Sequence, residues 1–241
     1  MGSKWQFIRR DAVSSKMRSN LNRNVILLII SAITLAATIT VGYGTPTSTA
    51  PYTSITLDQY SSTAIYGNGL SLTLSLNSTT YHPGEQATVT IHEKNTLATE
   101  NNIPVANRWP VQNLNLGPCG TLNYPFGISI LRGYYDAKDV GDITPLQLFN
   151  PNVLPLCPMM LAGIVSYDFQ PESDIAVIHT SWDSEPGAIK TSINMTAGVT
   201  ASGFWTGSHP NATFSNFTPG IYTVVGGDEW GALVVLHFTV T

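Results

Sequence analysis

The feature that most constrains this chain is an uncharged apolar run at residues 25–43, rich in Val, Ile, Leu and Ala. As a helix it would be about 28 Å long, close to the roughly 30 Å hydrocarbon core of a bilayer. Six of the eleven Lys and Arg residues precede residue 24, and no basic residue follows the run until Lys94. Since positive flanks stay in the cytoplasm, we expect residues 1–24 to be a basic cytoplasmic tail, residues 25–43 a transmembrane helix and the remainder extracytoplasmic.

A cleaved signal peptide is the alternative interpretation of the same run. The small residues Ser48-Thr49-Ala50 could be accepted by a signal peptidase, and the product would then be secreted. The apolar run is, however, longer than the roughly 7–15 residues usual in such signals. We therefore expect a single-pass protein held in the cell membrane by an uncleaved signal-anchor.

The charge of the remaining chain excludes one class of partner. Beyond residue 45, five basic residues face fourteen acidic ones. A phosphate backbone would repel such a surface, so nucleic-acid binding is not expected. Charged residues make up only 11% of the chain, against roughly 25% in ordinary soluble domains, and the abundant Gly, Pro, Ser, Thr and Asn are typical of turn-rich β proteins.

The pattern beyond the apolar run predicts a stalk followed by an all-β domain. Residues 44–64 are rich in Ser, Thr and Pro and predict a stalk. Leucines at positions 70, 72, 74 and 76 alternate with Ser and Thr, as on a half-buried strand, and so do the apolar residues of 87–91 and 232–240. The run Gly226–Gly231 predicts a long hairpin loop. We therefore expect an antiparallel β-sandwich over residues 65–241, in which a Pro-rich insertion at about 106–165 either packs on the sandwich or supplies part of its second sheet.

Two segments resemble immunoglobulin-like and fibronectin-like modules. The run Phe217-Thr218-Pro219-Gly220-Ile221-Tyr222-Thr223-Val224 resembles the "PGxYxV" turn and strand near the end of such modules, and Tyr81-His82-Pro83-Gly84-Glu85 before residues 87–91 resembles their first hairpin. The resemblance covers about a third of the domain. It implies an Ig-like sandwich in which Tyr222 anchors a strand corner through its hydroxyl. The layout of basic tail, apolar helix, Thr-rich stalk and Ig-like domain also resembles archaeal cell-surface proteins.

The two cysteines and four Asn-x-Ser/Thr triplets suit an extracytoplasmic location. Cys119 and Cys157 are the only cysteines, so a single disulfide is expected in an oxidising compartment. Its loop of about 38 residues would stabilise the fold by about 4 kcal/mol in the chain-entropy model. The triplets are acceptor patterns for N-glycosylation and begin at Asn77, Asn194, Asn211 and Asn216.

No motif predicts catalysis, a metal or a cofactor. The segment His179–Asp183 contains His, Ser and Asp, but a hydrolytic triad normally draws these groups from separate elements. The Gly226–Gly231 segment has no Cys or His to bind copper. Asp136, Asp139 and Asp142 lack EF-hand spacing and, like Asp228-Glu229, predict solvated polar turns.

Loop aromatics are the remaining candidates for recognition. Trp205 and Trp230 lie in Gly-rich segments, where an exposed indole could stack on a sugar or fill a partner's pocket. The alternative is that both indoles fold back and cap the ends of the sandwich.

We therefore expect a non-catalytic, membrane-tethered module for adhesion, envelope architecture or ligand capture, with a protein or glycan partner and possible self-association. The alternatives are a pilin-like filament subunit and an accessory subunit of a membrane complex whose helix docks through Ser31, Thr34, Thr38 and Thr40. A cupredoxin-like copper protein is a more distant alternative.

Overall fold

The computed structural model describes residues 53–58, 60–117, 124–152 and 163–241, which all belong to one compact unit, Ala50–Thr241. The expected tail, the apolar run 25–43, Cys119 and Cys157 lie outside the described residues. Within the described ranges, no helix is long and apolar enough to cross a membrane. The one helical element there is a short 3-10 turn, η1 (Val140–Asp142).

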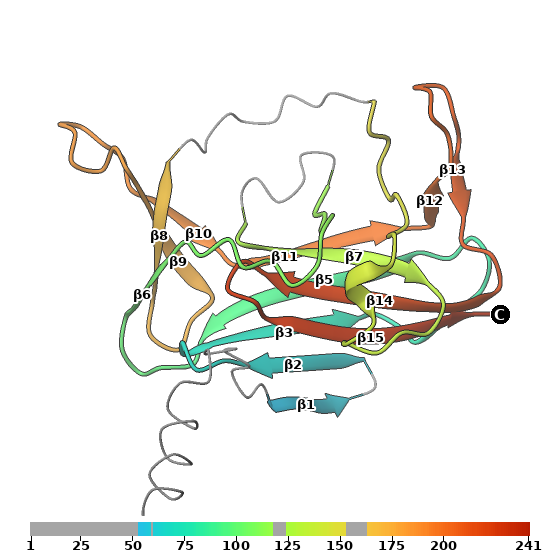
Figure 1. Ribbon diagram of the computed structural model, residues 1–241, viewed down its shortest axis with the longest axis horizontal. Coiled ribbons are helices and arrows are strands. Elements are labelled where there is room, and N and C mark those ends of the chain that lie inside the picture. The colour runs from blue at the N-terminus through green and yellow to red at the C-terminus, as the bar shows by residue number, and fades with distance from the viewer. Residues whose placement is uncertain (1–52, 59, 118–123, 153–162) are drawn as a thin grey trace, which may run out of the picture. The chain divides into compact units, whose positions relative to one another are not determined.

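Two sheets form the sandwich seen in Figure 1. Sheet A is antiparallel throughout, in the order β1 (Thr53–Asp58), β2 (Ser61–Ile65), β3 (Leu70–Leu76), β5 (Ala87–Asn95), β11 (Thr196–Ala201). Sheet B has the order β4 (Thr80–Tyr81), β15 (Leu233–Val240), β14 (Gly220–Asp228), β7 (Phe126–Arg132). Its strands are antiparallel except for β4, which runs parallel to β15.

The core lies between these sheets and follows the alternation of the strands. In β5 every second residue from Ala87 to Asn95 is buried, and β15 alternates in the same way. Strands β14 and β15 face β3, while β7 faces β5. The sheets approach closely at Gly226, where an added Cβ would lie 2.9 Å from Val234 and 3.1 Å from Ile91. A side chain there would therefore overpack the core.

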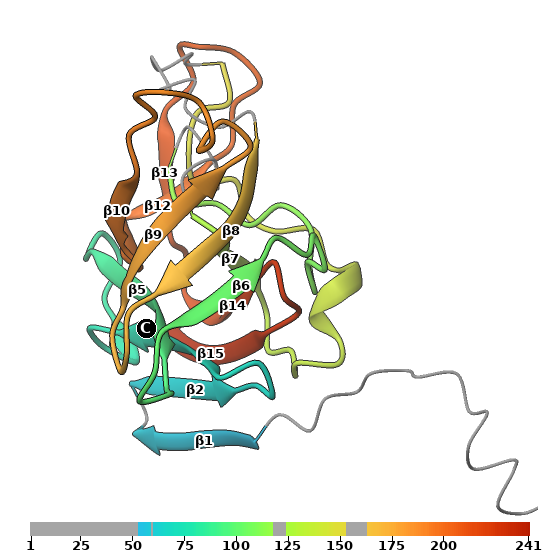
Figure 2. The same cartoon turned by 90° about the vertical axis from the view of Figure 1, so that its left-hand side faces the viewer.

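Two smaller sheets extend the sandwich at opposite ends (Figure 1). Sheet C has the order β10 (Thr191–Asn194), β9 (Ile175–Thr180), β8 (Ile164–Phe169), β6 (Asn101–Pro104). Sheet D pairs β12 (Gly203–Trp205) with β13 (Phe214–Asn216). Figure 2 looks along the sandwich from the sheet C end, where the strands β6, β8 and β9 lie in front.

The described chain confirms the all-β class and the antiparallel sheets expected of a sandwich. It differs from the stalk predicted at residues 44–64, because β1 and β2 lie there and join sheet A through β3. The inward residues of β2 are Ser62 and Ala64, which are too small and too polar to give an apolar alternation.

The predicted insertion at about 106–165 contains β7, so the second interpretation of that segment holds. β7 is a strand of sheet B and pairs with β14 from Phe126 to Arg132. The outer face of sheet B carries its own apolar cluster, made of Val111, Leu114, Leu131, Val140 and Val225. The proline-rich stretches on either side of β7 thus cover the second face of the sheet.

Candidate functional site

The connection between β9 and β10 presents an exposed tryptophan on a fixed backbone. Trp182 follows the end of β9, and 59% of its surface is exposed. Its amide donates to Thr180 Oγ1 at 3.3 Å, and its carbonyl accepts from the Glu185 amide at 2.9 Å. We call residues 181–190 the β9–β10 loop; its Ile189 is 87% exposed. Large apolar side chains are thus displayed where burial would ordinarily be favoured.

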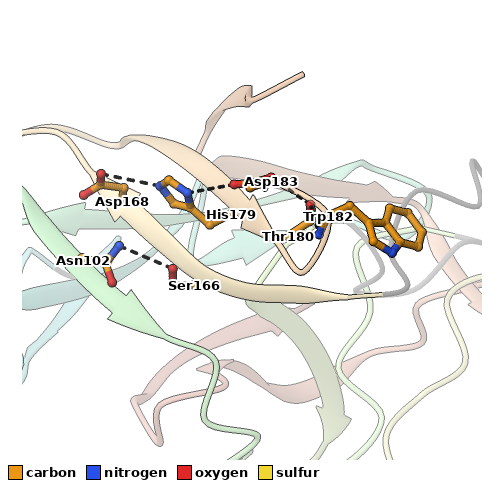
Figure 3. Close-up of polar contacts among 7 residues, drawn as sticks. All are labelled: Asn102, Ser166, Asp168, His179, Thr180, Trp182 and Asp183. Atoms are coloured by element: carbon orange, nitrogen blue, oxygen red, sulfur yellow. Dashed lines mark hydrogen bonds and ion pairs between the residues drawn. The ribbon is translucent and has the colours of Figure 1, made fainter. Parts of the chain in front are cut away.

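A polar network beside Trp182 fixes the start of this loop (Figure 3). Asp183 Oδ1 accepts from the Thr180 hydroxyl at 2.9 Å, and its Oδ2 lies 3.0 Å from His179 Nδ1. On the other side of the imidazole, Nε2 lies 3.6 Å from Asp168 Oδ2. His179 therefore stands between two carboxylates, one from its own turn and one from the neighbouring strand β8.

The surroundings of Asp183 favour its charged form. The hydrogen bond from Thr180 chiefly, with a smaller contribution from His179, lowers the pKa of Asp183 below its ordinary value. An ionised Asp183 is a stronger acceptor for the Thr180 hydroxyl. The network is therefore an anchor for the turn that carries Trp182.

The same geometry does not form a hydrolytic triad. Ser166 lies opposite His179 in the β8–β9 ladder, but its hydroxyl accepts from Asn102 Nδ2 at 3.4 Å. No donor or acceptor of the described chain is within hydrogen-bond reach of His179 Nε2. A general base needs its nucleophile within that reach. His179 and Asp183 do converge, because the turn after β9 brings Asp183 back beside the strand.

The two tryptophans predicted for recognition are not displayed. Trp205 is buried in β12, and its amide donates to the Gln147 carbonyl. Trp230 is partly buried; its indole Nε1 donates to the Pro104 carbonyl at 2.8 Å, and its ring meets Tyr167 edge to face. Both indoles thus fold back against the protein, as the alternative interpretation expects. Local Gly content could not distinguish Trp182 from these two, because exposure depends on what the fold brings to each ring.

The predicted hairpin loop at Gly226–Gly231 is also shorter than expected. Strand β14 continues through Asp228, and Gly227 pairs with Leu233 of β15. Asp228 and Glu229, predicted as a solvated turn, are therefore buried, together with Glu93 of β5. Asp228 Oδ1 accepts from the amides of Trp230 at 2.9 Å and Ala232 at 2.7 Å, which closes the turn.

Burial makes these carboxyls weak acids. It raises the pKa of Glu93 well above its ordinary value, and the neighbouring Asp228 raises it further. Burial raises the pKa of Asp228 to about 6, against the lowering effect of its backbone hydrogen bonds. Burial and then Asp228 raise the pKa of Glu229 to about 7. Burial therefore favours the protonated form of each of the three carboxyls.

The aspartates at 136, 139 and 142 form a turn beside a small cavity. The Asp139 amide donates to the Asp136 carbonyl at 2.9 Å, directly before η1. A cavity of about 150 Å³ on the outer side of sheet B is lined by Asn113, Ser129 and Asp142, among others. In the described ranges, no three His, Cys, Asp or Glu side chains converge as a metal site.

Of the remaining predicted residues, the corner tyrosine lies in the core and the four triplet asparagines lie at the surface. Tyr222 is fully buried, and its hydroxyl donates to the Thr218 carbonyl at 2.7 Å, which ties the turn before β14 to the strand. The four triplet asparagines, Asn77, Asn194, Asn211 and Asn216, are all exposed. Asn77 also accepts from the Thr88 amide at 2.7 Å, so its side chain already supports the β3–β5 connection.

Comparison of the chain with protein-family models, with curated proteins and with solved structures finds no match.

Proposed function

We propose that the chain is a membrane-tethered, non-catalytic binding module of the cell surface, and that it captures glycans through the β9–β10 loop. The observation that carries this proposal is the exposed indole of Trp182 on a turn fixed by hydrogen bonds. A fixed platform loses little conformational entropy when a ligand binds. The apolar run 25–43 and its basic flank support the tether.

The surroundings of Trp182 favour a sugar as the ligand. Ser181, Ser184 and Glu185 are exposed beside it in the same loop. An indole face stacks on the apolar face of a sugar ring, while hydroxyl and carboxylate groups accept or donate hydrogen bonds to its hydroxyls. The β-sandwich is consistent with an Ig-like module, which is part of the proposal, as are a Cys119–Cys157 disulfide and glycosylation at the exposed triplet asparagines.

The test is binding of the full chain, in mild detergent, to an array of immobilised oligosaccharides and envelope polysaccharides. Trp182→Ala should weaken binding at least about tenfold, as expected for removal of a central aromatic contact. Tyr134→Ala is the matched control, because Tyr134 is 62% exposed but precedes η1, on another part of the fold. An equal loss of binding in both variants, or no loss in Trp182→Ala, contradicts the proposal. If the chain binds no sugar but captures an envelope protein in a way that depends on Trp182, the partner of the loop is a protein.

A further inference from the structure

Three carboxyl side chains from two sheets are buried together in the sandwich. Glu93 has no exposed surface, Asp228 and Glu229 are almost as inaccessible, and the inward face of β5 directs Glu93 toward Asp228 of sheet B. No N–H or O–H donor in the described chain reaches either carboxyl oxygen of Glu93 or Oε1 of Glu229. An ionised carboxylate in such a place loses its hydration without gaining a replacement.

No positive charge compensates this cluster among the residues that the structure describes. The ion pairs there involve only His92 and His179, at other places in the fold. The titratable side chain that packs against the cluster from sheet C is Tyr167 of β8. Burial chiefly, and the charge of Glu229, raise the pKa of Tyr167, so it stays neutral. Since the described groups do not converge as a metal site either, a proton is the cation that fits.

We propose that Glu93, Asp228 and Glu229 form a proton-binding site that closes the junction of sheets A, B and C in mildly acidic medium and weakens it toward neutral pH. A protonated Glu93 can donate to Asp228, whereas two ionised carboxylates repel each other. The junction includes the Trp230 turn, which Asp228 caps and which packs against Tyr167 and Phe169 of sheet C. The proposal does not depend on what the β9–β10 loop binds.

The sign of the effect follows from linkage. The folded-state pKa values of these acids lie above their unfolded values, so the folded state holds more protons in the intervening range. Their stabilising contribution is complete below an unfolded pKa of about 4 and is lost as the pH rises through the folded values of about 6 for Asp228 and about 7 for Glu229. The domain should therefore be more stable in weak acid than at neutral pH.

The experiment is urea unfolding of the full chain in mild detergent at a series of pH values, with tryptophan fluorescence as the readout. We expect the unfolding equilibrium constant to rise at least about tenfold between about pH 5 and about pH 8. Glu93→Gln keeps the shape of the side chain without its charge, so it should raise the denaturation midpoint at the higher pH and flatten the profile. The matched control is Glu185→Gln, which removes an exposed carboxylate of the β9–β10 loop and should leave the profile unchanged.

Other outcomes overturn the proposal. If the stability of the wild type to urea is independent of pH, or increases with pH, the proposal is contradicted. This result needs no variant, so the test remains valid even if Glu93→Gln does not fold. If stability depends on pH equally steeply in the wild type and in Glu93→Gln, Glu93 is not part of the proton-binding site. Stabilisation by millimolar Ca²⁺ at the higher pH, lost in Glu93→Gln, makes the cluster a metal site instead.

Discussion

Asp183 in the β9–β10 turn receives a hydrogen bond from Thr180 and faces His179, whereas Glu93 in the core receives no hydrogen bond at either oxygen. The pKa of Asp183 is lowered by the Thr180 hydrogen bond, and the pKa of Glu93 is raised by burial. The same chemical group thus supports the turn locally as an anion and stabilises the core as a neutral acid. The sandwich and its projecting turn should therefore respond to pH in opposite directions.

The largest effect is expected from removing the Asp228 side chain, whose carboxyl accepts two backbone hydrogen bonds in the core. Asp228→Ala leaves the buried amides of Trp230 and Ala232 without their acceptor, which should cost about 3 kcal/mol of unfolding free energy. Urea unfolding at about pH 5, where the carboxyl is mostly protonated, isolates this loss from charge repulsion. Asp228→Asn retains a carbonyl acceptor and should lose much less; equal losses in the two variants would show that the cap does not stabilise the turn.

A smaller effect is expected from a buried hydroxyl that is fully bonded. Tyr222→Phe removes the hydrogen bond to the Thr218 carbonyl but keeps the ring stacked on Phe238. We expect a loss of about 1 kcal/mol in thermal or urea unfolding, with little dependence on pH. Tyr134→Phe, at an exposed tyrosine, is the control and should unfold like the wild type. A pH-dependent loss in Tyr222→Phe would show that the pH response of the core does not come from its carboxyl groups alone.

The smallest effect on global stability is expected in the β9–β10 turn. Asp183→Asn removes the charge that faces His179 and weakens the acceptor for Thr180. The unfolding midpoint should stay constant, while the amides of Trp182 and Glu185 exchange faster with deuterium. Asp168→Asn is the control, because Asp168 lies only at ion-pair distance, 3.6 Å, from His179.

Acid should reproduce the effect of Asp183→Asn in the wild-type chain. The folded-state pKa of Asp183 is lowered, so its contribution is present above the unfolded value of about 3.9 and is lost as the pH falls through the lower folded value. The protection factors of the turn amides, which correct for the intrinsic pH dependence of amide exchange, should therefore fall in strong acid. Protection factors that rise there instead would show that both carboxyl groups respond to pH in the same direction.

The sequence predicted the central strands well and the ends of the sheets poorly. The Leu70–Leu76 run coincides with β3, and its four leucines are all buried, because side-chain direction in a strand has a period of two; Ser71 is buried as well. β2 was missed because its buried side chains are small. The glycines at 226 and 227 predicted a loop, yet they belong to β14, where a side chain at position 226 would crowd Val234 of the same sheet and Ile91 of sheet A.

The candidate site was harder to predict than the fold. The burial of Trp230 and of the core carboxyls depends on contacts across sheets, such as Trp230 against Pro104 and Tyr167, or Glu93 against Asp228. Trp182 stays exposed because, within the described chain, the fold brings no such contact to its ring. Local composition contains no information on these contacts. The turn at Asp183 could have been inferred more closely, because Asp183-Ser184-Glu185-Pro186-Gly187 ends β9 and returns the chain toward it.

The parallel pairing of β4 with β15 sets the order in which the domain can assemble. The Thr241 amide donates to the Tyr81 carbonyl, so the end of β15 closes against a segment 160 residues earlier. β15 also lies between β4 and β14. Until β15 is present, β4 therefore has no partner in sheet B. During synthesis, sheet B therefore cannot complete its pairing until β15, the last strand, has emerged, whereas β2, β3 and β5 of sheet A can pair earlier.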